Sequence, residues 1–528
     1  MKKILLVIST VIITLTSTIA YAGNADNWTV KDTDVCAPIN GDDFSCLAKV
    51  RHFINNGAEV FSPTQADLGN VIKRFNSFGG VNPQAAPGVN PISGAGLRTA
   101  YNITNLGDPT KVIAIVDAYD NPKAFSNLTT FRSQNSLPTM NSCALANINT
   151  SATPCFAKVN QSLGMTPPSA NTGWAQEIDL DLQAASAVCP LCSILLVEAS
   201  SATFANLGAA VTAAASVSGV RAISNSFGTS SDVAQTSYPQ WNNVAASIPV
   251  FASTGDAGYQ RSASFPASST NVVGVGGTTL AVGNNGVRYS ESAWSGGGSG
   301  CSAYNAKPTW QSIPSAPCGT KKAISDVSAV ADPASGLQVY TTGSSGTTWY
   351  VFGGTSLASP IIAAMQAMQG GYDSTSLVTQ YSGSATKKLL DITTGSNASS
   401  CTPSIMCKTG TGWDGPTGVG SIYSAITGTT PIGTAPAISS VTISGSAKVN
   451  YTLTASASTT GTAPITLTYQ WQWSSTPTGS YSNITGARSS TYTISSTYRG
   501  RYIKVAVVAS NSFGTTATTY SAPTTQIA

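Results

Sequence analysis

The chain has 528 residues, of which 41% are hydrophobic and only 9% are charged. Soluble domains usually carry about 25% charged residues, so this chain is poor in charge, and its apolar content excludes a disordered protein. The 26 basic and 22 acidic residues give a net charge of +4, which provides no positive field for binding nucleic acid. Histidine occurs once, at His52, which excludes any site that requires two histidines.

The first 22 residues have the layout of a secretory signal peptide. Lys2 and Lys3 precede an apolar stretch that ends near Ile19, and Ala20–Ala22 supply the small residues of a cleavage site. We therefore expect a secreted protein, extracellular or periplasmic, after removal of residues 1–22. A membrane anchor is the alternative interpretation of this segment. No later stretch is long and apolar enough to predict a membrane span.

The ten cysteines form five pairs that are close in sequence. The pairs are Cys36/Cys46, Cys143/Cys155, Cys189/Cys192, Cys301/Cys318 and Cys401/Cys407. Such spacing predicts local disulfide bonds in an oxidising compartment. A redox function for the Cys-Pro-Leu-Cys motif at residues 189–192 is the alternative, although the motif lies in an apolar run among other paired cysteines.

Strand-like and helix-like segments alternate through the central part of the chain, residues 96–426. The expected strands are Val112–Val116, Ile194–Val197, Ala222–Ser224, Val250–Ala252 and Val272–Val275, and the expected helices include Phe204–Val217 and Val233–Ser247. The alternation predicts an α/β domain with a largely parallel sheet covered by helices on both faces. We interpret residues 23–95, which precede it, as an N-terminal segment or a short pro-region.

The composition changes at residues 427–439, a small-residue, proline-containing stretch that predicts a linker. Beyond it no cysteine occurs, and short segments with period-2 alternation predict an all-β sandwich over residues 440–528. Trp471 as a core tryptophan, together with Tyr502 after Gly500, resembles bacterial immunoglobulin-like modules. The resemblance names no ligand, and we expect the partner of such a module to be a surface polymer or a protein.

The strongest signal for chemistry is the sequence Gly-Gly-Thr-Ser-Leu-Ala-Ser-Pro at residues 353–360, which precedes the helical pattern Ile361–Met368. A turn of small residues that places Ser356 at a helix start surrounds its hydroxyl with free N–H groups, which suits an acyl-transfer nucleophile. An ordinary helix N-cap is the alternative. The motif resembles the nucleophile motif of the subtilisin and sedolisin superfamily.

A serine nucleophile needs a base, and His52 is badly placed for that role. Subtilisin-type enzymes have the order Asp, His, Ser, whereas His52 precedes Asp117, the natural strand-end aspartate. The order His52, Asp117, Ser356 fits that of chymotrypsin, but the context of Ser356 does not. Residues 255–258 also mimic a chymotrypsin-like nucleophile motif, with alanine in place of the serine. We interpret His52 as a surface residue without a catalytic role.

The alternative base is a carboxylate. Glu177 and Asp181 are four residues apart on a predicted helix and therefore lie on one face, one turn from each other, whereas Asp179 points elsewhere. No basic residue occurs between Lys158 and Arg221 to compensate this charge. A solvated acidic helix face is the alternative interpretation.

Glu177 and Asp181, with Asp256 in Gly-Asp-Ala-Gly and Ser356 in Gly-Thr-Ser, together resemble the sedolisins, or serine-carboxyl peptidases, in identity, order and spacing. The resemblance extends over residues 98–425 and implies a subtilisin-like fold and an endopeptidase acting on proteins and peptides. It implies that Glu177 is the general base for Ser356, that Asp181 orients and tunes Glu177, and that Asp256 is the oxyanion donor. A carboxyl group donates a hydrogen bond only when protonated, so this set implies an acid pH optimum.

A second set near the domain end resembles the sedolisin calcium site. Asp391 and Asp414 supply carboxylates, and glycine-rich turns supply backbone carbonyls, which together make an all-oxygen set suited to Ca²⁺. The resemblance implies a structural calcium ion held by Asp391, Ile392, Gly410, Gly412 and Asp414. A Gly/Pro turn that contains an aspartate is the alternative.

Three features depart from the sedolisin pattern. Only residues 23–95 precede the catalytic pattern, where sedolisins usually have a large pro-domain. Gly353 stands where serine is usual, and Asp117 stands where a subtilisin has its catalytic aspartate, so a role for Asp117 in the site stays open. The alternative function is a secreted binding or adhesion protein that keeps an inactive protease fold.

Overall fold

The computed structural model describes residues 28–36, 43–55, 58–59, 88–89, 91–238, 241, 248–259, 264–282, 288–313, 317–343, 346–381, 389–422, 436–461, 465–511 and 514–528. The expected signal peptide, most of the expected linker and more than half of the expected helix Val233–Ser247 lie outside these residues. The chain divides into two compact units, Met1–Gly428 and Thr429–Ala528, and each is described by itself. None of the helices in the described residues is long and apolar enough to cross a membrane.

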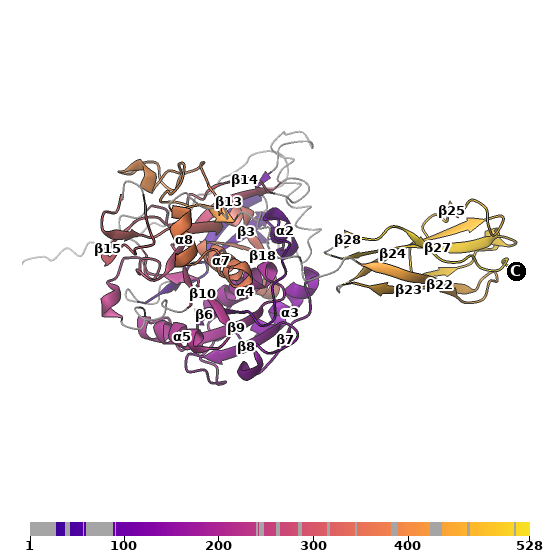
Figure 1. The fold of residues 1–528 in the computed structure, drawn as a ribbon, viewed down its shortest axis with the longest axis horizontal. Coiled ribbons are helices and arrows are strands. Elements are labelled where there is room, and N and C mark those ends of the chain that lie inside the picture. The colour runs from indigo at the N-terminus through magenta and orange to yellow at the C-terminus, as the bar shows by residue number, and fades with distance from the viewer. Residues whose placement is uncertain are drawn as a thin grey trace, which may run out of the picture. The chain divides into compact units, whose positions relative to one another are not determined.

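The first unit is built on a ten-stranded sheet (Figure 1). Its strands follow the order β14–β13–β12–β10–β6–β9–β8–β7, and β5 and β17 also pair with β13. Neighbours from β13 to β7 run parallel, whereas β14 is antiparallel to β13. The strands are β5 (Gly88–Val89), β6 (Val112–Ala118), β7 (Asn141–Ser142), β8 (Cys155–Asn160), β9 (Ser193–Ala199), β10 (Val220–Asn225), β12 (Val250–Ser253), β13 (Val273–Val282), β14 (Arg288–Ala293) and β17 (Val327–Val330). The predicted α/β fold with a largely parallel sheet is confirmed.

The sheet is buried on both faces because alternate residues of a strand enter different cores. On β6, Ile113 and Ile115 belong to one apolar cluster, and Val112, Ala114 and Val116 belong to the other. Every residue of β6 and of β9 is buried, as continuous apolar runs predict. Each face of the sheet therefore needs its own layer of packed helices.

Helices α4 and α7 lie side by side on one face of the sheet, and α5 covers the other (Figure 1). Ile178 of α4 and Ile361 of α7 pack in the cluster that contains Ile113, whereas Leu207 of α5 packs in the second cluster. The α-helices are α2 (Gly94–Ala100), α3 (Ala124–Gln134), α4 (Thr172–Val188), α5 (Phe204–Ser216), α7 (Thr355–Gln369) and α8 (Ser374–Tyr381), with 3₁₀ turns at Leu145–Asn147, Gln235–Ser237, Pro333–Ser335 and Ser404–Met406. The packing of α4 on α7 brings the predicted base and the predicted nucleophile to the same face.

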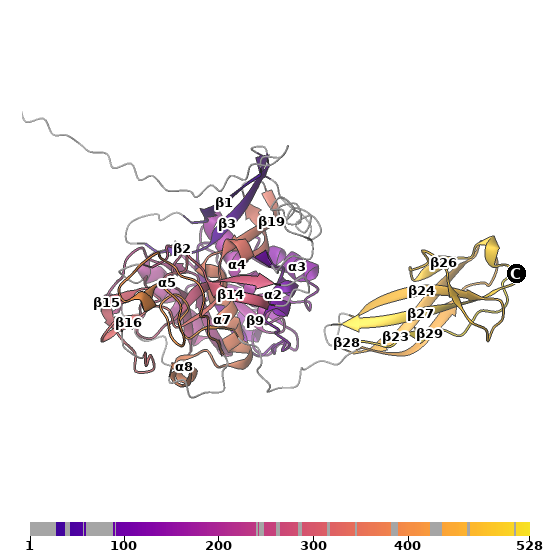
Figure 2. The ribbon, with the colours of Figure 1, turned by 90° about the horizontal axis from the view of Figure 1, so that it is seen from above.

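Part of the N-terminal segment belongs to a second sheet of this unit, with the path β1–β3–β19–β18. The pairs along this path are antiparallel, and Figure 2 shows β1 and β3 beside β19. A further strand of the segment, β2, pairs with β11. The strands are β1 (Trp28–Asp34), β2 (Ser45–Cys46), β3 (Lys49–Asn55), β4 (Ala58–Glu59), β11 (Phe227–Gly228), β18 (Leu337–Gly343) and β19 (Gly346–Gly353), and short pairs are formed by β15 (Cys301–Ala306) with β16 (Lys321–Ala323) and by β20 (Leu389–Leu390) with β21 (Ser421–Ile422). Because β19 leads into α7, the N-terminal segment lies next to the predicted nucleophile.

Five disulfide bonds close short loops of the first unit, and each joins the two cysteines of a predicted pair. Cys189 and Cys192 are bonded to each other and are both 0% exposed. A redox-active thiol must be reached by its partner, so this burial disfavours the redox interpretation.

The second unit consists of two sheets around one core, which is compatible with a β-sandwich. One sheet has the order β22–β23–β26; the other has the order β25–β24–β27–β28, with β29 also paired to β27. Trp471 is fully buried in the core between them, as the sequence predicts, and its indole N–H donates to Ser489 O at 2.9 Å. The elements are β22 (Ala437–Ser444), β23 (Thr452–Thr460), β24 (Thr466–Ser474), β25 (Ser482–Asn483), β26 (Thr491–Thr493), β27 (Tyr502–Asn511), β28 (Gly514–Thr515), β29 (Thr519–Tyr520) and a 3₁₀ turn at Ser496–Tyr498. The immunoglobulin-like relationship stays a prediction.

A fragment that ends at Gly428 is expected to fold without the second unit, because the apolar clusters of the two units share no residue among those described. The measurement is a thermal unfolding curve of this fragment beside that of the full chain. A cooperative transition at the temperature of the first unit in the full chain is the expected result. A fragment that aggregates or unfolds without cooperativity would contradict the independence of the two cores.

Candidate active site

The predicted nucleophile, Ser356, is the second residue of α7 and is fully buried. Gly354 precedes the helix with φ of +96°, a conformation that favours glycine. A Cβ at this glycine would lie 2.1 Å from Leu47 O and 2.6 Å from Asp256 Oδ2. The glycine before the helix is therefore required both by the backbone turn and by the close approach of these two oxygens.

Ser226, which follows β10, forms hydrogen bonds with both the hydroxyl group and the backbone carbonyl of Ser356. The Ser356 hydroxyl donates to Ser226 O at 3.1 Å, and the Ser226 hydroxyl donates to Ser356 O at 3.1 Å. Ser356 O is available because Pro360, four residues later in α7, has no N–H to donate to it. The proline in the motif thus leaves the Ser356 carbonyl free to accept the hydrogen bond that connects this residue to the end of β10.

The predicted base and its neighbour, Glu177 and Asp181, lie one turn apart on α4 and are both 0% exposed. None of their four carboxylate oxygens has a hydrogen-bond partner among the described residues. The alternative of a solvated acidic face is therefore wrong. The helix is placed by its N-cap, Asn171, whose side chain accepts from Trp174 N at 3.1 Å.

Burial raises the pKa of Glu177 well above its ordinary value of 4.5, and the neighbouring carboxyls of Asp181 and Asp117 raise it further. The Ser356 hydroxyl lies close enough to lower this pKa, as a hydrogen-bond donor does, although it donates to Ser226 O in the structure. Burial likewise raises the pKa of Asp181 well above 3.8. The carboxyls therefore share protons as one coupled group.

Asp117 joins this group, which settles the position of a residue whose role the sequence leaves open. It lies near the carboxyl end of β6, is 0% exposed, and has no hydrogen-bond partner on either carboxylate oxygen within the described part of the chain. Burial raises its pKa well above 3.8, and the charges of Asp181 and Glu198 raise it further. Glu198 lies opposite Asp117 on the neighbouring parallel strand β9.

Glu198 and Ser226 were missed by sequence reasoning. Glu198 extends the acidic group and forms an ion pair of 3.5 Å with Lys158 on β8. Burial raises the pKa of Glu198 to about 8, against the lowering effects of Asn121 N–H and Lys158. The sequence does contain a signal for Glu198. Asp117 and Glu198 each stand near the carboxyl end of a buried strand, and such ends meet at one edge of a parallel sheet.

Asp256 follows β12 and faces the start of α7. Its Oδ1 accepts from Thr355 N and from Thr355 Oγ1, each at 2.8 Å, while its Oδ2 is buried and has no partner among the described residues. The residue as a whole is partly exposed, but burial of its carboxyl raises its pKa to about 7, against lowering effects of Lys49 and Thr355. A carboxyl with one bonded oxygen and one free oxygen is arranged to carry a proton on the free oxygen.

His52 lies on β3, with Nε2 2.8 Å from Thr33 Oγ1 of β1. The imidazole is thus part of the β1–β3 hairpin. Asp179, which was expected to point away from the other two acids of α4, accepts from Asn127 Nδ2 at 2.7 Å and from Thr341 Oγ1 at 2.6 Å. Both residues therefore have structural partners outside the group around Ser356.

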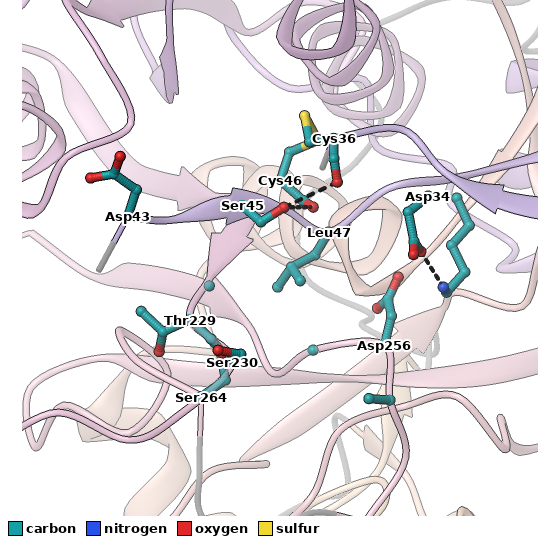
Figure 3. A pocket seen from close by; sticks show the side chains of 14 residues that line it. Asp34, Cys36, Asp43, Ser45, Cys46, Leu47, Thr229, Ser230, Asp256 and Ser264 are labelled. Carbon is teal, nitrogen blue, oxygen red and sulfur yellow. Dashed lines mark hydrogen bonds and ion pairs between the residues drawn. A yellow bond between two sulfur atoms is a disulfide. The ribbon is translucent and has the colours of Figure 1, made fainter. Parts of the chain in front are cut away.

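A cavity of about 240 Å³ lies beside Asp256 (Figure 3). Thr229 and Ser264 line it from the first unit's loops, and Ser45 and Leu47 line it from the N-terminal segment. The space beside Asp256 is therefore shared by the α/β framework and the segment that precedes it.

The predicted calcium ligands come together in loops that flank β20 and the 3₁₀ turn at Ser404–Met406. Asp391 Oδ2 accepts from Gly412 N at 2.9 Å, and Asp414 Oδ2 accepts from Gly410 N at 3.1 Å. Burial raises the pKa of Asp414 to about 7, and the charge of Asp391 adds to this rise. Ile392 is buried. Within the described residues, three or more His, Cys, Asp or Glu side chains nowhere gather as a metal site.

Comparisons with known proteins agree with this geometry. The model of the subtilase family (Peptidase_S8) matches residues 170–420. Sedolisin from Pseudomonas sp. (strain 101) is 37% identical over 181 residues, which cover 31% of this chain and 30% of sedolisin. Kumamolisin from Bacillus sp. (strain MN-32) is 32% identical over 143 residues, which cover 24% of this chain and 25% of kumamolisin.

These matches span less than a third of the length of either curated relative. The solved structure of Pseudomonas sedolisin, a serine-carboxyl proteinase, superposes with a TM-score of 0.53 at 24% identity and covers 64% of this chain and 97% of that chain. The order of the sheet, the position of α7 and these matches lead to one conclusion. Residues 170–420 are similar to the subtilase family, and the α/β unit has the subtilisin-like fold of sedolisin.

Proposed function

We propose that the chain is a secreted serine-carboxyl endopeptidase. The observation that carries this proposal is the position of the Ser356 hydroxyl beside a buried carboxyl, Glu177, rather than beside an imidazole. The subtilase match and the sedolisin relatives support a peptidase acting through serine. The five disulfide bonds support secretion, because such bonds persist in oxidising compartments.

In this mechanism Glu177 takes the proton of the Ser356 hydroxyl as the oxygen attacks the carbonyl carbon of a peptide bond. Asp181 and Asp117 raise the proton affinity of Glu177, which acts as a base only in molecules whose coupled carboxyls have lost a proton. Hydrolysis therefore needs a pH at which Glu177 has lost its proton while Asp256 has kept its own. The proton of the Ser356 hydroxyl then passes to the leaving amine, and water releases the acyl group from Ser356. The buried acids thus supply the base that histidine supplies in other serine hydrolases.

The oxyanion of the tetrahedral intermediate needs donors at the start of α7. Ser356 N is one donor, and a protonated Asp256 Oδ2 is the other. Asp256 is protonated only below its pKa of about 7, so this donor is lost at higher pH. The site is therefore expected to be most active at acid pH.

A structural calcium ion is a further proposal for the loops that hold Asp391 and Asp414. Asp391 Oδ1 is buried without a partner among the described residues, and the two carboxylates lie close enough to repel each other. These observations fit a cation, which would be held by Asp391 and Asp414 with carbonyls of Ile392, Gly410 and Gly412. When bound, the ion would neutralise the two acids and fix the loops.

Hydrolysis of a protein substrate is expected to be maximal at acid pH and to decline as the pH rises through about 7, since Asp256 then loses its proton. Ser356→Ala and Glu177→Gln are expected to lower kcat by roughly 10⁴- to 10⁶-fold. The matched control is His52→Ala, which is expected to keep near wild-type activity. A rate that reaches a plateau above pH 7, or an inactive His52→Ala enzyme, would overturn the carboxylate mechanism.

Glu177→Gln is also expected to raise the melting temperature by a few degrees at neutral pH. A raised pKa in the folded state means that the contribution of Glu177 to stability is full below about pH 4.5 and is lost as the pH rises. The gain should therefore vanish at pH 4. The matched control is Asp232→Asn, which should lower the melting temperature, because the Asp232 carboxylate accepts from Ser302 Oγ at 2.7 Å and from Ala303 N at 2.6 Å. If the Glu177→Gln protein were less stable than wild type at pH 7, the conclusion that the buried Glu177 carboxylate lacks stabilising partners would be contradicted.

Chelation of calcium is expected to lower the melting temperature of the first unit at pH 7, because an ion that binds only the folded state stabilises it. The effect should shrink toward pH 4, where Asp414 is protonated. Asp414→Asn should abolish the response, whereas Asp373→Asn, at an acid that accepts from Ser376 N at the start of α8, should keep it. An unchanged melting curve in chelator, together with no calcium by elemental analysis, would show that the calcium proposal is wrong.

A further inference from the structure

The charges of the chain are divided unevenly between its two units. Residues 1–428 contain 21 basic and 22 acidic residues, whereas residues 429–528 contain five basic residues and no aspartate or glutamate. The five are Lys448, Arg488, Arg499, Arg501 and Lys504. Every charged side chain of the second unit is therefore positive, although the chain as a whole has a net charge of only +4.

Three of these cations lie at one end of the second unit. Lys448 lies in the turn between β22 and β23, and Arg499 and Arg501 directly precede β27. The last residues of the chain connect the two places, because the residue after Lys448 donates its N–H to Ala528 O at 3.2 Å and Ile527 N donates to Arg501 O at 2.9 Å. Two segments that flank one strand are about 10 Å apart, which is two strand spacings. Figure 1 shows the C-terminus at the end of this unit opposite β28.

Lys504 extends this set along the outer face of the second sheet. Both neighbours of Lys504 on β27 belong to the apolar core, so the lysine between them points to the opposite face. A strand rises about 3.3 Å per residue, which places Lys504 roughly 10 Å from Arg501. The cations before and on β27 therefore form a row that continues from the end of the unit onto the sheet.

Aromatic rings, rather than carboxylates, hold two of these cations in place. The Arg501 guanidinium lies over Trp473, 5.0 Å from the ring centroid. The Lys504 ammonium lies between two tyrosines, 4.3 Å from the ring centroid of Tyr481 and 4.2 Å from that of Tyr520. A ring orders a cation without neutralising its charge or using up its N–H donors, whereas a carboxylate would do both. These charges are thus ordered in advance and uncompensated, which suits an anionic ligand.

The surroundings of the cations distinguish between kinds of anionic partner. In the part of the second unit that the structure describes, the large hydrophobic side chains exposed to solvent are Tyr451 and Tyr520, and none is aliphatic. A surface that enters a bilayer needs apolar side chains to insert, so a membrane is disfavoured. Single-stranded nucleic acid needs rings with open faces for its bases, whereas Trp473, Tyr481 and Tyr520 each turn a face to a cation.

Amide side chains beside Lys504 suit the hydroxyl groups of sugars. Gln472 of β24 pairs with Lys504 of β27, so the two side chains project from the same face of the sheet. The Gln472 amide donates to the exposed Asn483 Oδ1 at 2.8 Å, which leaves the NH₂ group of Asn483 and the carbonyl of Gln472 for a ligand. A surface with ordered cations and adjacent amides matches a polymer that carries both carboxylates and hydroxyls.

We propose that the second unit binds an acidic polysaccharide through the carboxylates of its uronic acid units. The binding surface, here called the cationic face, consists of Lys448, Arg499, Arg501 and Lys504 with the amides of Gln472 and Asn483. The planar guanidinium groups match carboxylates in a bidentate manner, and Lys504 adds a point charge. Binding at the cationic face uses no residue around Ser356 and therefore does not depend on the proposed peptidase activity.

The experiment measures the Kd of the full chain for polygalacturonate at pH 7, with Ser356→Ala as the parent so that proteolysis does not interfere. The Kd is expected to rise with salt, since salt screens exposed ion pairs. Replacement of Arg499, Arg501 and Lys504 together by glutamine should raise the Kd roughly tenfold or more and flatten its dependence on salt.

A matched control removes three cations of the first unit, Arg221→Gln, Lys307→Gln and Lys408→Gln, and should keep the Kd of the parent because the net charge alone does not create the site. A second variant, Lys448→Gln with Arg499→Gln, changes two exposed side chains that hold no ring in the structure. It should also weaken binding and keep the melting curve of the parent, so a folding defect in the triple variant does not decide the result.

Three results would overturn the proposal. An equal Kd for the parent and for both cationic-face variants would show that these residues do not bind the polymer. Binding of neutral dextran as tight as that of polygalacturonate would remove the role of charge. Tighter binding to DNA, to polyglutamate or to vesicles of anionic lipid at the same salt concentration would assign the cationic face to another class of partner.

Discussion

The structure depends on the burial of several carboxyl groups that have no basic partner beside them. Glu177, Asp181 and Asp117 are each 0% exposed and lack hydrogen-bond partners among the described residues. Carboxyls in this state keep their protons to higher pH than exposed ones, because the charged form has lost its water and faces like charges. Packing of α4 against α7 and β6 therefore determines both the chemistry of the site and the pH at which the fold is most stable.

Ser226 is the residue through which the sheet positions this chemistry. Its two bonds to Ser356 fix the first turn of α7, and the Ser226 hydroxyl also lowers the pKa of Asp181. Pro360 permits one of these bonds by lacking an N–H group. A single residue after β10 thus connects Ser356 on one helix with the acids on another.

The N-terminal segment contributes to the same site from outside the α/β framework. Lys49 lowers the pKa of Asp256 and forms an ion pair with Asp34 of β1. Lys49 thus favours the ionised form of Asp256, whereas burial and the charge of Asp34 favour the protonated form. The segment therefore places charges of both signs near Asp256.

The sequence by itself determined the features that depend on residues close in the chain. The disulfide pairs were readable because each closes a short loop, and Glu177 and Asp181 were placed together because a helix repeats every 3.6 residues. The turn of small residues before Ser356 indicated the start of a helix, and the apolar runs indicated buried strands. The tertiary structure alone decided that Asp117 and Glu198 face the site, since strands far apart in sequence become neighbours only when the sheet forms. It also decided that residues 43–50 lie across Ser356, because backbone hydrogen bonds between strands carry almost no trace in the side-chain sequence.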